Sequence, residues 1–169
     1  RCDLEPNVID EIQRSSHGGW YAEHQVATGQ EDGAFFTRAH YTVGRELIDE
    51  ALEAVRRQVE LCDAFQGFMV YHSAAGATGS GFMALLLERL SVEYDKKMKV
   101  SYSLWPSPKM STSVVEPYDA VLAAHAMLEQ IDLAVMLDNS MLYEACEKKL
   151  KIEAPKYADV NRVIAAHAS

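Results

Sequence analysis

The fold is decided by residues 68–82, which read FMVYHSAAGATGSGF. An apolar, partly β-branched run passes into glycines and other small residues, and leucines at helical spacing follow at positions 85, 86 and 90. This order predicts a strand, a tight turn and a helix. Small residues let a ligand approach the backbone, and the N–H groups at the start of a helix attract phosphate. The stretch is therefore interpreted as a phosphate-binding turn.

The spacing of the glycines excludes two common nucleotide-binding motifs. No lysine follows the turn, as a P-loop requires, and Gly76, Gly79 and Gly81 do not fit the pattern G-x-G-x-x-G. A turn of small residues also occurs as a close-packed connection between a strand and a helix, without any ligand. The turn alone leaves both interpretations open.

Composition limits the class of protein and the kind of partner. The chain has 169 residues, of which 49% are hydrophobic and 24% charged, as expected for one soluble domain with a sizeable core. A net charge of −9 argues against nucleic acid or an anionic membrane as the main partner.

The cysteines and the apolar runs indicate the compartment. Cys2, Cys62 and Cys146 lack the spacing of a zinc site, which predicts reduced, buried thiols and a cytoplasmic protein. No apolar run approaches the length of a membrane span, and no export signal is recognised.

Predicted strands and helices alternate along the chain. Strands are predicted at 67–72, 100–104 and 133–137, and helices at 8–12, 41–61, 82–94, 117–128 and 142–150. Residues 15–40, rich in glycine, are predicted to form a long surface loop, and Asn7 is predicted to cap the first helix. Alternation at this spacing predicts an α/β fold, a three-layer Rossmann-like parallel sheet with helices on both faces.

Polar clusters follow three of the predicted strands. They are the Gly76 turn, the turn at 111–116 and the pair Asp138-Asn139. In open parallel sheets, ligands bind at the carboxyl ends of the strands. If these polar clusters had only a structural role, their shared position directly after a strand would be a coincidence. We therefore expect the three clusters to converge on one edge of the sheet.

Several motifs, in order and at matching spacing, resemble those of the tubulin family. They are Asp3-Leu4-Glu5-Pro6, His40-Tyr41-Thr42, Thr78-Gly79-Ser80-Gly81-Phe82, Glu88-Arg89-Leu90-Ser91-Val92, Val115-Glu116-Pro117-Tyr118 and Asp138-Asn139. The His40 and Glu88 motifs resemble alpha rather than beta subunits, and the motif at 115–118 separates the chain from the bacterial FtsZ relatives. The likeness covers nearly the whole chain.

This resemblance implies a partial GTP-binding domain over residues 1–169, without the family's first strand and its second and C-terminal domains. It implies a structural constituent of microtubules in the cytoplasm and cytoskeleton, with beta-tubulin as partner and microtubule-associated proteins as further partners. GTP and Mg²⁺ would be held at a non-exchangeable site. The acidic residue with which alpha subunits act on the beta subunit's nucleotide lies outside this chain, so no catalytic residue is assigned.

The resemblance also implies roles for individual residues. The residues expected to hold phosphates are Ser73, Gly76, Thr78, Gly79 and Ser80. Thr112 and Glu116 are expected to contact phosphate or ribose. Asn139 and Asn161 are expected at the guanine edge, with Tyr157 stacked on the base. Glu5 and Asp32 are expected to act on Mg²⁺ through its waters. From the residues alone, without the resemblance, the two asparagines are interpreted as helix caps or surface amides, Tyr157 as a core aromatic and Glu5 as an ordinary loop carboxylate.

Some positions depart from the family pattern. Ala75 and Ala77 stand where the family has glycines, and a methyl group at 77 is expected to cost about 1 kcal/mol or to block a phosphate if that position needs a positive φ. Residues 33–39 are one residue shorter than in the family and include two phenylalanines, and Asp119 replaces an asparagine. An alternative is therefore a degenerate tubulin-like chain that binds no nucleotide and serves as an interaction module. An unrelated doubly wound enzyme would need a nucleophile and base pair, which is not recognised.

Overall fold

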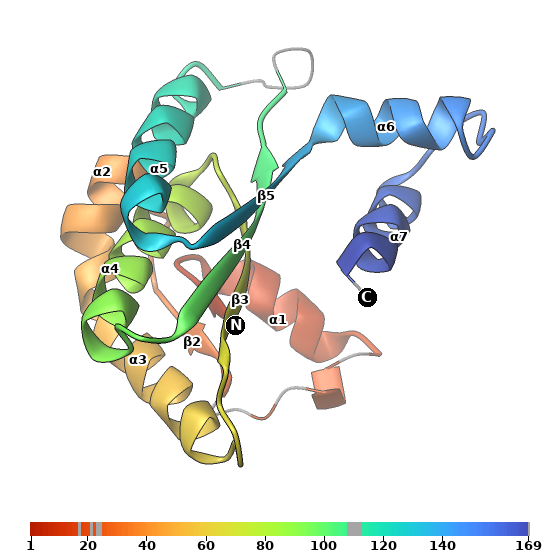
Figure 1. Ribbon diagram of the computed structural model, residues 1–169. Coiled ribbons are helices and arrows are strands. Elements are labelled where there is room, and N and C mark those ends of the chain that lie inside the picture. The colour runs from red at the N-terminus through yellow and green to blue at the C-terminus, as the bar shows by residue number, and fades with distance from the viewer. Residues whose placement is uncertain (17, 21, 23–24, 108–112, 169) are drawn as a thin grey trace.

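The computed structural model describes residues 1–16, 18–20, 22, 25–107 and 113–168, and its strands form two parallel sheets (Figure 1). The smaller sheet pairs β1 (Cys2–Asp3) with β2 (Ala27–Thr28). The larger sheet has the order β3-β4-β5, formed by β3 (Gly67–Ser73), β4 (Met98–Trp105) and β5 (Leu133–Asp138). Each pair is parallel, so the carboxyl ends of β3, β4 and β5 meet at one edge.

Helices separate the strands along the chain. They are α1 (Pro6–Arg14), α2 (Phe36–Arg38), α3 (Gly44–Glu60), α4 (Met83–Glu93), α5 (Glu116–Gln130), α6 (Asn139–Lys148) and α7 (Tyr157–Ala168). Short π-helical turns at Ala39–Val43 and Ala77–Phe82 lead into α3 and α4. Because α2, the first π-turn and α3 follow one another without a break, residues 36–60 form one helical stretch.

The larger sheet carries helices on both faces. Phe68 and Val70 of β3 pack against the cluster that includes α3 and α4. Leu104 and Leu137, which are register partners on β4 and β5, pack against a second cluster from α6 and α7. Leu104 is also the register partner of Ser73, whose side chain points away from the face of Phe68 and Val70. The predicted three-layer parallel fold is confirmed.

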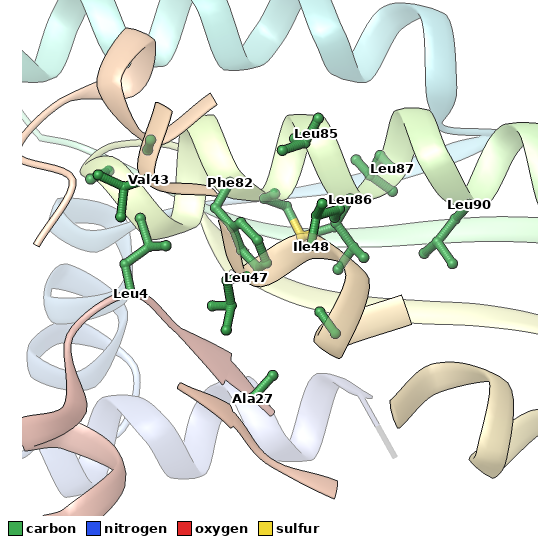
Figure 2. Packing of buried hydrophobic residues seen from close by; sticks show 14 residues of the cluster. Leu4, Ala27, Val43, Leu47, Ile48, Phe82, Leu85, Leu86, Leu87 and Leu90 are labelled. Carbon is green, nitrogen blue, oxygen red and sulfur yellow. The ribbon is translucent and has the colours of Figure 1, made fainter. Parts of the chain in front are cut away.

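The main core lies between the sheets and helices α3 and α4 (Figure 2). In α4, every residue from Met83 to Leu87 is buried, and so is Leu90. A helix that is apolar on most sides is stable only when it is enclosed, and α4 contacts both α3 and α5. Leu4, which follows β1, and Ala27 of β2 join the same cluster, so the core connects the two sheets.

The prediction of a long surface loop at 15–40 is wrong in part. The described part of this segment contains a 3₁₀ turn at Gly18–Trp20, strand β2 and helix α2. Ala27 is buried opposite Cys2, and Phe36 is buried at the start of α2. These contacts join residues far apart in the sequence, so the local pattern of glycines could not reveal them.

The predicted cap of the first helix is also wrong. Helix α1 starts at Pro6, with Glu5 in the capping position, so Asn7 lies inside the helix. The Asn7 side-chain amide donates a hydrogen bond to the carboxylate of Glu5. Proline is favoured at the first helical position because its missing N–H is not needed there, which places the start one residue earlier.

The three cysteines are free, as predicted, but only Cys146 is fully buried. Burial of Cys2 raises the pKa of its thiol. Cys62 is exposed, and its thiol donates to the carbonyl oxygen of Gln58 at 3.3 Å. Cys62 lies just after the end of α3, which explains why its side chain is exposed although a buried thiol was predicted.

An exposed ion-pair network on α3 makes stability depend on pH. Hydrogen bonds from Arg56 and then Arg57 lower the pKa of Glu53 from 4.5 to about 2. A lowered pKa means that the contribution to stability is present above pH 4.5 and is lost as the pH falls towards 2. We expect Glu53→Gln to have a lower melting temperature than the wild type at pH 6, by a small amount because the pairs are exposed.

The difference in melting temperature between wild type and Glu53→Gln should shrink as the pH falls below 4.5 and be mostly lost at pH 2. Glu46→Gln is the matched control, because it removes a carboxylate of the same helix that takes part in none of the ion pairs given by the described residues. Melting curves of the three proteins between pH 2 and 6 make the comparison. A difference in melting temperature that stays constant over this pH range would contradict the role given to the Glu53 carboxylate.

Candidate functional site

A hollow of about 220 Å³ lies at the carboxyl ends of β3 and β4. The residues that line it come from four separate parts of the chain, namely Ser73, Ala75, Gly76, Leu104, Trp105, Pro106, Ser107, Glu116 and Asn139. The structure therefore brings together the Gly76 turn, the start of α5 and the start of α6, as the sequence predicts. Thr112, predicted for the same site, lies outside the described residues.

Gly76 gives the turn its shape. Its φ of 84° and ψ of 161° lie in a region that is essentially restricted to glycine. The next helical stretch begins at Ala77, and the Ser80 N–H donates to the Gly76 carbonyl at 3.1 Å. The N–H groups of residues 77–79 therefore precede this first hydrogen bond of the helical stretch. N–H groups in this position, together with the helix dipole, form an anion-binding site.

Two further helices begin at the hollow. Glu116 is the first residue of α5 and Asn139 the first of α6, and both line the hollow. Asp138 caps α6 by accepting a hydrogen bond from the Met141 N–H at 3.1 Å. Three helix starts thus face one space, which favours a negatively charged ligand. The negative carboxylate of Glu116 repels a negative ligand group placed next to it. It suits a ligand hydroxyl group instead, from which it can accept a hydrogen bond.

Ser73 lines the hollow but already has partners in the protein. Its hydroxyl donates to the Leu104 carbonyl at 3.4 Å and accepts from the Ala75 N–H at 3.2 Å. The bond to Leu104 is long, so it is weak. The Ser73 hydroxyl can therefore turn towards a ligand at small cost.

The hydroxyls of Thr78 and Ser80 hold the turn instead of lining the hollow. Thr78 donates to the Asp3 carboxylate at 2.9 Å and accepts from the Leu4 N–H at 3.3 Å, which ties the turn to the end of β1. Ser80 is buried, and its hydroxyl donates to the Gly76 carbonyl. Both side chains stabilise the shape of the turn. The Thr78 N–H precedes the first hydrogen bond of the helical stretch, whereas the Ser80 N–H already donates to the Gly76 carbonyl.

The methyl group of Ala77 does not enter the hollow. Ala77 belongs to the main core, and a Cβ built on Gly33 would lie 2.8 Å from its methyl carbon. Positive φ values among the described non-glycine residues occur only at Ala34 and Lys151, so Ala77 carries no such strain. The expected obstruction at this position is therefore absent. Ala75 does line the hollow, so its methyl group narrows the space.

Asp119 points away from the hollow as well. Its Oδ1 accepts a hydrogen bond from the Phe36 N–H at 2.9 Å, which caps the start of the 36–60 helical stretch. The residue is buried, and its second oxygen has no hydrogen-bond partner among the described residues. A direct repulsion between Asp119 and a ligand in the hollow is therefore not expected.

Comparison with known proteins identifies the family. The profile of the Tubulin/FtsZ family, GTPase domain, matches residues 1–147. The chain belongs to the Tubulin/FtsZ family. It is 51% identical over 164 residues to the tubulin alpha-2B chain of Physarum polycephalum, and 49% identical over 164 residues to the tubulin alpha-8 chain of Caenorhabditis elegans. The matched region is 96% of this chain but only 36% of each relative, so the chain spans about a third of their length.

Two residues that the tubulin resemblance places at the guanine base lie outside the hollow. Tyr157, the first residue of α7, is 74% exposed, and its ring centroid lies 6.4 Å from that of Tyr143. Asn161 lies beside Tyr71 in a separate, open hollow between α7 and β3. Of the residues predicted to contact the base, the structure brings only Asn139 to the hollow.

The carboxylates predicted for Mg²⁺ also lie elsewhere. Glu5 accepts a hydrogen bond from Asn7, and Asp32 accepts one from the Ala34 N–H at 3.1 Å. Within the described ranges no group of three or more His, Cys, Asp or Glu residues could hold a metal ion directly. A Mg²⁺ ion bound through water and phosphate needs no such cage.

The sequence analysis missed Trp105, Pro106 and Ser107. They follow directly at the carboxyl end of β4, the position where ligands bind in sheets of this class. Ser107 is buried and its hydroxyl forms a hydrogen bond with that of Ser140. Applying the rule to every strand end, and not only to polar clusters, would have found them.

Over the described residues, no helix is long and apolar enough to span a bilayer.

Proposed function

We propose that this tubulin-family chain binds GTP together with Mg²⁺ at the hollow beside Gly76. The observation that carries the proposal is the convergence of three helix starts on one space at the carboxyl edge of a parallel sheet. Backbone N–H groups of the turn would bind the phosphates, with Gly79 allowing close packing and Ser73, Thr78 and Ser80 supporting the turn. Glu116 would accept a hydrogen bond from the ribose, and Thr112 is proposed for the same part of the ligand.

The size of the hollow suits the phosphates better than the whole nucleotide. About 220 Å³ is below the roughly 300–1,000 Å³ typical of pockets that enclose a small ligand. The guanine base would then extend past Asn139, whose amide offers both a donor and an acceptor. Asn161 and Tyr157 are proposed for the outer side of the base, and Glu5 and Asp32 for the waters of Mg²⁺, on the family resemblance.

The proposed biological role follows the alpha-tubulin relatives. The chain, taken as a partial nucleotide-binding domain over residues 1–169, would act as a structural constituent of microtubules in the cytoplasm and cytoskeleton. Beta-tubulin is the proposed partner, with microtubule-associated proteins as further partners. No catalytic residue is proposed within the chain.

Titration of the purified chain with fluorescent GTP and Mg²⁺ tests the nucleotide site. We expect saturable binding at micromolar concentration and weaker binding of ATP, because an amide that pairs with the guanine edge is mismatched with adenine. Removing Mg²⁺ with EDTA should lower the affinity, since the triphosphate would then lack its counter-charge beside Glu116. Absence of saturable binding would contradict the proposal and favour the degenerate chain that serves as an interaction module.

A further inference from the structure

We propose that His72 is a positioning residue, whose imidazole ring holds the 73–79 turn in the shape that binds phosphate. The proposal rests on the nucleotide site proposed above. His72 is the next-to-last residue of β3, directly before the turn, and it does not line the hollow. Its role is therefore to act through the backbone of the turn.

The ring of His72 contacts both ends of the turn. Nδ1 lies 3.0 Å from the carbonyl oxygen of Ser73 and 2.8 Å from that of Gly79. On the other side of the ring, Nε2 lies 2.8 Å from the hydroxyl oxygen of Ser101 on β4. One side chain thus links the first residue of the turn, the last residue of the turn and the neighbouring strand.

The partners determine which nitrogen carries the proton. Carbonyl oxygens only accept hydrogen bonds, so Nδ1 must be the donor to Ser73 and Gly79. Nε2 is then an acceptor for the Ser101 hydroxyl at 2.8 Å, which is a shorter contact than that of the same hydroxyl with the Met127 Sδ at 3.8 Å. Ser101 is fully buried, which keeps its hydroxyl directed at the few polar groups within reach.

The backbone of the turn is closed at the point that His72 contacts. A Cβ built on Gly79 would lie 2.6 Å from the carbonyl oxygen of Ser73, so the two backbone segments touch. Gly76 lies midway between them with its positive φ. A turn closed at its base and bent at its centre presents its N–H groups in a fixed direction. Ligand affinity gains from such preorganisation because less ordering is needed on binding.

Two amide substitutions separate the two sides of the ring. Asparagine places its side-chain nitrogen near the position of Nδ1, whereas the longer glutamine reaches the position of Nε2. We expect His72→Asn to keep the contact with Gly79 and to bind GTP within about threefold of the wild type. His72→Gln keeps the contact with Ser101 but releases the turn, so its affinity should fall about tenfold.

Three measurements on the full chain test the positioning role. They are the dissociation constant for GTP with Mg²⁺, the melting temperature, and the ¹⁵N chemical shifts of the His72 ring, which report the protonated nitrogen. Ser101→Ala provides a variant with the ring intact, and we expect it to lower affinity about threefold with a smaller fraction of Nδ1–H. This variant also serves if His72→Gln fails to fold.

The outcomes distinguish the two proposals. Weaker binding by His72→Gln than by His72→Asn, at equal melting temperatures, supports positioning by Nδ1. Equal affinities of wild type and all variants, or a wild-type ring protonated only at Nε2, would overturn the inference and leave the nucleotide site standing. A wild-type chain that binds no GTP would overturn both.

Discussion

Leu87→Ala is expected to lower the free energy of unfolding by about 3 kcal/mol, within the range of roughly 2–5 kcal/mol for buried leucines. Leu87 is 1% exposed in the middle of α4 and lies in the cluster that joins α3, α4 and both sheets (Figure 2). Alanine removes apolar area from the core and leaves a cavity that the enclosing elements cannot fill. For a chain of this size, the loss corresponds to a melting temperature lower by about 6–12 °C.

Leu128→Ala is the matched control for this substitution. It makes the same chemical change on a helix, but Leu128 is 84% exposed on α5. Surface changes of this kind usually alter stability by less than about 0.5 kcal/mol. Urea unfolding of the three proteins measures both values. Similar decreases in the free energy of unfolding for the two variants would show that α4 is not the centre of the core.

Gly76→Ala is expected to lower the affinity for GTP about tenfold or more. Nothing lies within 4 Å of the position that the new Cβ would occupy, so the substitution creates no collision. The effect arises from the backbone, because φ of 84° with ψ of 161° costs a non-glycine residue about 1–3 kcal/mol. The turn would relieve this strain by changing φ, which redirects the N–H groups of the residues that follow Gly76.

Gly19→Ala is the control for this second substitution. Gly19 also has open space where a Cβ would lie, and among the described glycines only Gly76 has a positive φ. The control therefore adds the same methyl group without the backbone strain. Fluorescent GTP titration of wild type and both variants gives the comparison. Unchanged affinity of Gly76→Ala would show that the turn does not hold the nucleotide.

The sequence predicted the parts of the fold that depend on local pattern. The apolar run at 68–71, the glycines and the leucines of α4 predicted a strand, a turn and a helix, and the structure has them in that order. The alternation of strands and helices implied that their polar ends meet, and Gly76, Glu116 and Asn139 do line one hollow. Family membership was also recognisable, because it rests on motifs and their spacing.

Only the tertiary structure decided what individual side chains in and around the turn do. Thr78 is bonded to Asp3, 75 residues away, and Asp119 to Phe36, 83 residues away. The methyl group of Ala77 points into the core instead of the hollow, and the ring of His72 closes the turn. Sequence alone determined the order of elements because strand and helix periodicity are local properties. Hydrogen-bond partners and side-chain directions depend on segments brought together by folding, so they had to be read from the structure.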